Sequence, residues 1–138
     1  MRNLSSRKLR KMHPSSESLA KKELNKLLAA KIIFPVEHTT WVENLVLIRN
    51  KLGDIIICID FRNLNWSSLK DNYLVPTMEQ ILQSVSRFSM LSLLDGFSGY
   101  NQVLVAKEDC LKMTFQTKWG TYAYEKIPFG LINAEATF

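Results

Sequence analysis

The sequence predicts an α+β fold, in which helices and antiparallel strands alternate along a chain the size of one domain. Two stretches, near residues 17–30 and 76–87, carry apolar residues at the three- and four-residue spacing of an amphipathic helix. Shorter apolar stretches at 41–49, 55–61, 88–94 and 112–126 are bounded by turn residues and have the length of strands. With 138 residues, 46% hydrophobic and 22% charged, the composition is that of a globular protein.

The first helix is predicted from Glu17 to Ala30. Ala20, Leu24 and Leu27 fall on one of its faces, and Pro14 shortly before it is a helix-start signal. The preceding residues 1–16 contain five basic and no acidic side chains, a composition that organellar transit peptides share. We interpret this stretch as a basic lead-in to the domain, and an organellar location stays open.

A β-hairpin is predicted next. Residues 41–49 and 55–61 are rich in Val, Leu and Ile, and the Asn50–Asp54 stretch between them has the composition of a turn. Residues 63–72 form a polar connection. Pro76 then opens a second helix with Met78, Ile81 and other apolar residues on one face.

The second half is predicted to complete a sheet. Residues 88–94 form an apolar strand that ends at Asp95, and two further strands, 112–117 and 121–126, flank a turn at Trp119 and Gly120. Residues 131–138 begin a helix that is too short to be stable alone. From this we expect that the domain is truncated.

Charge and cysteine content limit the classes of function. The net charge is +5, with +7 on residues 1–51 and −2 on residues 52–138, so the first half suits contact with a phosphate backbone or forms a solvated surface. Cys58 and Cys110 have no metal-binding or redox spacing, which predicts buried thiols and an intracellular protein. The longest apolar run, Ile55–Ile59, is far too short to span a membrane.

The stretch Leu94–Gln102 carries the strongest chemical signal. It places one carboxylate, Asp95, after an apolar strand, followed by small residues and then an aromatic ring, Tyr100. A lone aspartate after a strand is more often a turn or helix cap than a metal ligand. Nucleotidyl transfer, however, needs carboxylates that hold divalent metal ions beside a triphosphate. The motif therefore indicates a polymerase site if its context agrees.

The context does agree. Leu94–Gln102, with Pro128–Leu131 and Asn133–Phe138 downstream and Cys58–Asn65 upstream, resembles the reverse transcriptase of gypsy-type long-terminal-repeat retrotransposons, particularly those of plants. The resemblance runs from about Arg7 to Phe138. It implies a partial right-hand polymerase fold: a fingers hairpin and an incomplete antiparallel palm sheet with helices on one face. It also implies that the chain stops before the Tyr-x-Asp-Asp segment that carries the other catalytic carboxylates.

The resemblance assigns roles by position. Asp95 is implied to be the first catalytic and metal-binding aspartate, with the carbonyl of Gly96 completing part of a Mg²⁺ shell. Tyr100 is implied to lie beneath the sugar of the incoming nucleotide, although core packing is the alternative for this ring and for Phe129. The other implied nucleotide contacts come from backbone groups, an aromatic ring and a lysine at Ser98, Gly99, Phe129, Gly130 and Lys51, and the implied template contact comes from Arg62.

Some positions depart from the family pattern. Ile56 stands where the family has an arginine that clamps the triphosphate, and an alkyl side chain cannot replace the planar fork of arginine. Trp66 replaces a usual lysine, Leu74 an expected proline, and Glu135 a usual Pro or Gly. These changes suggest relaxed constraint on polymerase function.

Three hypotheses about function follow. The first is an RNA-directed DNA polymerase homologue, inactive as a fragment, whose partners by resemblance are an RNA or DNA template–primer and deoxynucleoside triphosphates. The second is a non-catalytic, basic nucleic-acid-binding remnant, and the third is a decayed reading frame without a role. Under the first, residues 1–16 are the lead-in, 17–87 the fingers-like region and 88–138 the start of the palm, with the remainder of the polyprotein missing.

Overall fold

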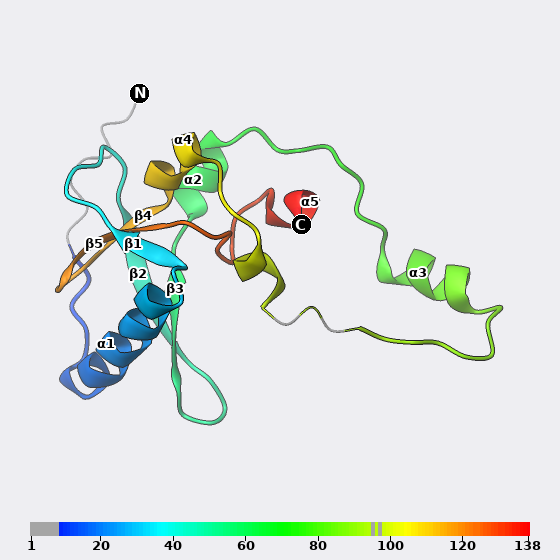
Figure 1. Ribbon diagram of the computed structural model, residues 1–138, viewed down its shortest axis with the longest axis horizontal. Helices are drawn as coiled ribbons and strands as arrows, with labels where there is room; N and C mark the ends of the chain where they lie inside the picture. Colours follow the sequence, from blue (N-terminus) through cyan, green and yellow to red (C-terminus); the bar gives the residue numbers. More distant parts are fainter. Residues whose placement is uncertain (1–8, 95, 97) are drawn as a thin grey trace.

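A five-stranded sheet, packed on one long helix, forms the body of the protein (Figure 1). The computed structural model describes residues 9–94, 96 and 98–138. The strands are β1 (Ile33–Pro35), β2 (Glu43–Arg49), β3 (Ile55–Ile59), β4 (Thr114–Thr117) and β5 (Gly120–Tyr124). The helices are α1 (Pro14–Ala29), α2 (Arg62–Ser67), α3 (Met78–Val85), α4 (Lys107–Cys110) and α5 (Ala134–Thr137), with short 3-10 turns at Gly99–Gln102 and Leu111–Met113.

The sheet has the order β1-β5-β4-β2-β3. Neighbouring strands are antiparallel except β2 and β4, which pair in parallel through Glu43 with Phe115 and Asn44 with Gln116. The predicted hairpin is therefore the β2–β3 edge of a mixed sheet. The α+β prediction is confirmed, while the antiparallel description of the sheet holds for all but this one pairing.

The core lies between α1 and the sheet. Leu24 of α1 is buried against it, together with Phe115 of β4 and Tyr124 of β5. Phe115 has no exposed surface, and its ring lies 5.5 Å from that of Tyr124, measured between centroids. Burial of large apolar and aromatic side chains is the main stabilising contribution to a small domain.

Local sequence signals set the ends of the helices. α1 begins at Pro14, three residues earlier than predicted, because the His13 ring nitrogen accepts a hydrogen bond from the Ser15 backbone N–H. α3 is closed at its start by a capping box, in which the side chains of Thr77 and Gln80 each accept the other's backbone N–H. The predicted connection 63–72 is partly helical, since α2 occupies its first half.

The prediction that residues 88–94 form a strand of the sheet is wrong. In the structure they are an extended segment outside the sheet, and Leu93 and Leu94 are almost fully exposed. A strand needs a neighbouring strand to accept its backbone hydrogen bonds, and no described strand lies beside this one.

Among the described residues, no helix is both long and apolar enough to cross a membrane.

Candidate functional site

Asp95, the predicted catalytic and metal-binding residue, lies outside the described residues, but Gly96 and the chain from Ser98 onward are described. The backbone of Ser98 is left-handed, with φ of 48°, which is strained for a residue with a side chain. This bend leads into the 3-10 turn Gly99–Gln102, where the Asn101 N–H donates to the Ser98 carbonyl at 2.9 Å. Tyr100 is thereby held on a tight turn.

A backbone ladder brings this turn to the predicted nucleotide-binding loop. The Val105 N–H donates to the Glu125 carbonyl at 2.9 Å, and the Ile127 N–H donates to the Val103 carbonyl at 3.0 Å. The two segments run antiparallel here, with Leu104 opposite Lys126. Tyr100 lies a few residues before the first of these segments, and Phe129 lies a few residues after the second. The pairing of the segments therefore brings the two rings to the same place.

Three aromatic rings meet there, and we call them the aromatic cluster: Tyr100, Phe129 and Phe138. The Tyr100 centroid lies 5.1 Å from that of Phe129 and 5.4 Å from that of Phe138, both in edge-to-face geometry. Phe129 and Phe138 are 67% and 64% exposed, so the cluster is a surface feature and not core packing. Phe138 was not among the predicted site residues, although it closes one of the motifs.

Gly99 is required by the aromatic cluster. A Cβ atom placed on Gly99 would lie 2.7 Å from Cζ of Phe138, which is closer than real carbon contacts allow. Only glycine lets the Phe138 ring approach the backbone beside Tyr100. The structure thus brings together Gly99, Tyr100 and Phe129, three of the predicted nucleotide-binding residues.

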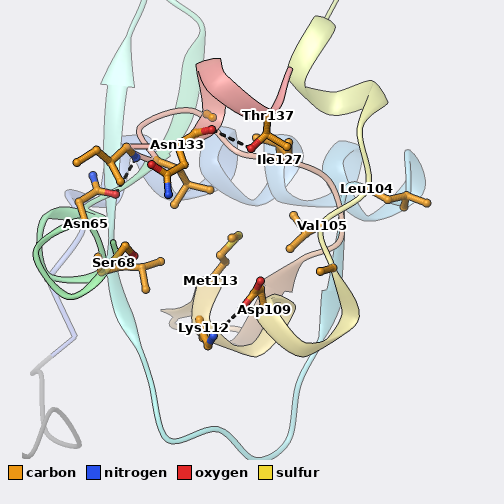
Figure 2. Close-up of a pocket in the computed structure, with 15 residues that line it drawn as sticks. Asn65, Ser68, Leu104, Val105, Asp109, Lys112, Met113, Ile127, Asn133 and Thr137 are labelled. Atoms are coloured by element: carbon orange, nitrogen blue, oxygen red, sulfur yellow. Dashed lines mark hydrogen bonds and ion pairs between the residues drawn. The ribbon is translucent and has the colours of Figure 1, made fainter. Parts of the chain in front are cut away.

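Gly130 is held in place by Asn65 of α2. Its φ of 95° is a backbone conformation that residues with a side chain rarely adopt. Its carbonyl accepts a hydrogen bond of 2.7 Å from the Asn65 side-chain amide. The Asn65 side-chain oxygen in turn accepts the Ile132 backbone N–H at 2.9 Å. One side chain therefore ties the loop behind Phe129 to the end of α2 (Figure 2).

Asn133 makes the reciprocal tie. Its side-chain amide donates to the Leu69 carbonyl, and its side-chain oxygen accepts the Asp71 N–H, both at 2.9 Å. We call Asn65 and Asn133 the asparagine clamp. The predictions missed it because its bonds join residues more than 60 positions apart, although both residues lie inside the motifs quoted above.

The clamp forms one wall of a cavity of about 310 Å³ (Figure 2). The opposite walls come from the 104–106 segment and from Asp109 and Lys112, whose side chains form an ion pair. Ile56, Asn101 and Phe129 are among the residues that line a smaller cavity of about 160 Å³. The position at which the family has a clamping arginine therefore faces the aromatic cluster.

Arg62, the predicted template contact, forms a two-pronged ion pair with Asp60. Its Nε donates to Asp60 Oδ1 at 2.7 Å and its Nη2 to Oδ2 at 2.6 Å, while Arg10 approaches the same carboxylate at 3.8 Å. Hydrogen bonding from Arg62 lowers the pKa of Asp60 to about 2. The Arg62 side chain is itself largely exposed, so it presents positive charge at the start of α2.

Lys51 is not brought to the aromatic cluster. It lies at the tip of the β2–β3 hairpin, where the Asn50 side chain accepts the backbone N–H groups of Leu52 and Asp54. In Figure 1 this tip points away from α5 and from the Gly99–Gln102 turn. A triphosphate contact from Lys51 therefore stays a prediction.

The described residues contain no group of three or more His, Cys, Asp or Glu side chains that is arranged to hold a metal ion. Magnesium is bound through several oxygen ligands, of which carboxylates are the main protein contribution. The described residues therefore show no ready-made cluster for such an ion, and Asp95 as a metal ligand stays a prediction.

Comparison with known proteins gives consistent results, although no family model matches. The chain is 32% identical over 122 residues to the retrovirus-related Pol polyprotein from transposon 297 of Drosophila melanogaster, which covers 88% of this chain and 12% of that polyprotein. It is 38% identical over 82 residues to an RNA-directed DNA polymerase homolog of Oenothera berteroana, covering 59% of this chain and 58% of that protein. The Pol polyprotein from transposon gypsy of D. melanogaster is 37% identical over 82 residues, 59% of this chain and 8% of that polyprotein.

Among solved structures, the fold matches the prototype foamy virus protease-reverse transcriptase with a TM-score of 0.80 at 18% identity. This match covers 96% of the present chain and 18% of the viral one. A foamy viral protease-reverse transcriptase in complex with double-stranded DNA matches with a TM-score of 0.77 at 12% identity, over 97% of this chain and 28% of that one. The chain thus spans from about a tenth to just over half of the length of these relatives.

Proposed function

Because the chain is a homologue of the reverse transcriptases of gypsy-type, retrovirus-related retrotransposons, we propose that it forms the part of an RNA-directed DNA polymerase that holds the template–primer end and the incoming deoxynucleotide. Residues 1–16 are the basic lead-in, 17–87 the fingers side and 88–138 the start of the palm. Polymerase activity, after which the longer relatives are named, is assigned to this chain only within this proposal.

The aromatic cluster is the observation that carries the proposal. Gly99, Tyr100 and Phe129 come from two segments that the sequence separates by almost thirty residues, and they meet a few residues after Asp95. The exposed rings of Phe129 and Phe138, which both contact the half-buried Tyr100, offer apolar surface beside a polar backbone turn, which suits the sugar and base of a nucleotide. Ser98 and Gly99 supply the backbone groups that face the triphosphate.

Reverse transcriptases in general use divalent metal ions, and we propose Mg²⁺ for this family member. Asp95 and the Gly96 carbonyl are the residues of this chain that would contribute to holding it. Since the described residues do not form a metal site by themselves, the other carboxylates come from polypeptide beyond this set. The chemistry that the metal supplies is activation of the attacking oxygen and neutralisation of the leaving phosphate.

Nucleic acid is the proposed partner of the basic first half of the chain. A relative of the same fold is solved with double-stranded DNA, and the first half of this chain carries most of its positive charge. Arg62, although paired with Asp60, remains exposed and can bind a template phosphate. Ile56 leaves the triphosphate without the arginine of the family, so nucleotide binding is expected to be weaker than in the relatives.

Photocrosslinking tests this function. The purified chain is mixed with an RNA–DNA template–primer whose 3′-terminal primer base carries a photoreactive group, and the crosslinked residues are mapped by mass spectrometry. The proposal expects crosslinks within Gly96–Gln102 and at Phe129, and their loss on Tyr100→Ala but not on Lys107→Ala, an exposed control in the same half. Crosslinks scattered over residues 9–51 would overturn it and favour a non-catalytic binder.

The charge distribution favours that second function, a basic protein that binds nucleic acid without catalysis. Its affinity would come from phosphate contacts alone, so it would fall with salt with a slope of about −0.9 per phosphate on duplex DNA. Replacing Lys8 and Lys11 by Glu would weaken it on every sequence. A salt titration of binding to duplex DNA and to an RNA–DNA hybrid therefore measures the contribution of phosphate contacts to affinity, separately from the crosslinking pattern.

A further inference from the structure

The three tryptophans of the chain lie in different surroundings. Trp41 and Trp119 are partly buried against the core, where the Trp41 indole donates to Glu43 at 3.1 Å. The ammonium groups of two lysines lie 5.6 and 5.9 Å from the centroid of the Trp119 ring. Trp66 of α2 is 90% exposed, and no ring, cation or hydrogen-bond partner of its indole is recorded among the described residues. Trp66 is therefore available to a partner from outside the described chain.

Neighbouring residues fix the direction in which α2 presents Trp66. Leu64 is buried in the core, and Asn65 binds the loop at Gly130 through both polar atoms of its side chain. Rotation of α2 about its axis would break these contacts, so Trp66, the next residue, stays in solvent. Tryptophan is on average a highly buried residue, so a side chain held this far out of the core calls for an explanation.

A cation lies on the same face of α2. Arg62 precedes Trp66 by four residues, and residues at this spacing on a helix are neighbours, with Cβ atoms about 5–6 Å apart. The Arg62 guanidinium is held by its two-pronged bond to Asp60, and its side chain is 79% exposed. The helix therefore presents a positive charge and a flat aromatic ring side by side.

The charge around this pair is positive. Besides the arginine on α2, Arg10 approaches the carboxylate of Asp60, at 3.8 Å. Two guanidinium groups thus share one carboxylate, whose side chain is only 9% exposed. Lys70 and Asp71, which follow α2, are both exposed and have opposite charges. One positive charge is therefore left over on the surface beside Trp66, and it attracts an anion.

A cation beside an exposed aromatic ring is the combination with which proteins bind single-stranded nucleic acid. The cation binds a phosphate, and the ring stacks on a base. Bases within a duplex have both faces covered by their neighbours, so it is the unpaired bases that stack on aromatic side chains. An apolar protein partner would gain from the ring but not from the positive charge beside it. The charge thus favours nucleic acid as the occupant.

We propose that Trp66 is a stacking platform for an unpaired base of the template strand, and that Arg62 binds the adjacent phosphate. Trp66 stands where the family has a lysine, so a side chain that binds charge is replaced by one that stacks. Stacking releases no counterions and tolerates any base, because every base has an aromatic face. The proposal rests on the proposed function, because it names the part of the template that α2 holds, a single-stranded overhang.

The test measures fluorescence anisotropy of three labelled DNA probes with the full chain: a single strand of mixed sequence, an abasic strand of the same length, and a blunt duplex. Trp66→Ala should lower the affinity for the single strand by about 5- to 150-fold, and leave the affinities for the abasic strand and the duplex unchanged. Leu74→Ala, which removes an equally exposed apolar side chain, should bind all three probes like the unchanged chain.

Two conservative variants separate stacking from other roles of the ring. Trp66→Phe should keep most of the affinity for the single strand, whereas Trp66→Leu, apolar but not aromatic, should lose it. Trp66→Lys restores the residue of the family and should steepen the salt dependence on a single strand, by about 0.7 in slope for one added phosphate contact. Because Trp66 is exposed, the circular dichroism spectra of all these variants should match that of the unchanged chain.

Equal affinity of Trp66→Ala and the unchanged chain for the single strand would overturn the proposal. An equal loss on the abasic strand, full binding by Trp66→Leu, or absence of single-strand binding at low salt would also overturn it. Sedimentation that shows a dimer of the chain alone, abolished by Trp66→Ala, would decide for a second copy on this face. Failure of the proposed function appears separately, because its crosslinks to the primer end depend on Tyr100 and not on Trp66.

Discussion

Replacing Asn65 by alanine should destabilise the body of the protein through the loop behind Phe129. The change removes two hydrogen bonds, to the Gly130 carbonyl at 2.7 Å and from the Ile132 N–H at 2.9 Å. A protein hydrogen bond contributes about 0.5–1.5 kcal/mol net, so two contribute about 1–3 kcal/mol. Because Asn65 is only half-buried and water can reach the freed groups, we expect about 1–2 kcal/mol.

Urea denaturation followed by tryptophan fluorescence measures this loss. With a slope of about 1.5 kcal/mol/M for a domain of this size, the midpoint should fall by about 0.7–1.3 M with an unchanged slope. Asn72→Ala is the matched control, because Asn72 is exposed and no hydrogen bond of its side chain to a described residue is recorded. Equal midpoints for the two variants would refute the reasoning that the asparagine clamp holds the loop.

Three further predictions concern the site. Gly99→Ala places a Cβ atom 2.7 Å from Phe138 Cζ and should push this exposed ring away from Tyr100, with the loss of one edge-to-face contact of about 0.5–1.5 kcal/mol; the cost should disappear in a Phe138→Ala background in a double-mutant cycle followed by thermal denaturation. Because Arg62 lowers the pKa of Asp60 to about 2, the stabilisation of the fold by Asp60 is present above pH 4 and is lost as the pH falls toward 2. In an acid titration of stability, Asp60→Asn should lack this loss between pH 4 and 2. Ile56→Arg should strengthen triphosphate binding in a filter assay without giving primer extension by residues 1–138, since these residues supply one candidate carboxylate of the catalytic set.

The elements that the sequence predicts correctly are those with strong local signals. The helix beginning at Pro14 and the hairpin around Asn50–Asp54 follow from periodicity, caps and turn residues that lie close together in the chain. The three-residue strand β1 was missed because so short a stretch carries no period. Residues 88–94 were assigned to the sheet because their composition suits a buried strand, and composition does not say whether a partner strand is present.

For the candidate site, the family resemblance predicted which residues take part, and the structure shows which of them lie together. Tyr100 and Phe129 were predicted from motifs, and they prove to be in contact. Lys51 was predicted for the same purpose and lies on a separate hairpin tip. The clamp residues Asn65 and Asn133 escaped prediction because an asparagine that bonds to distant backbone has no local sequence signature.

The asparagine clamp also closes a long loop of the chain, which includes β4 and β5. Asn133 fastens the stretch that follows α2 to the segment near the end of the chain, so residues 72–132 are a loop whose two ends are tied side by side. The free energy of closing a loop depends only weakly on its length, by about 0.6 kcal/mol per doubling. The part of this loop that precedes β4 can therefore gain or lose residues at small cost while the clamp still closes the loop.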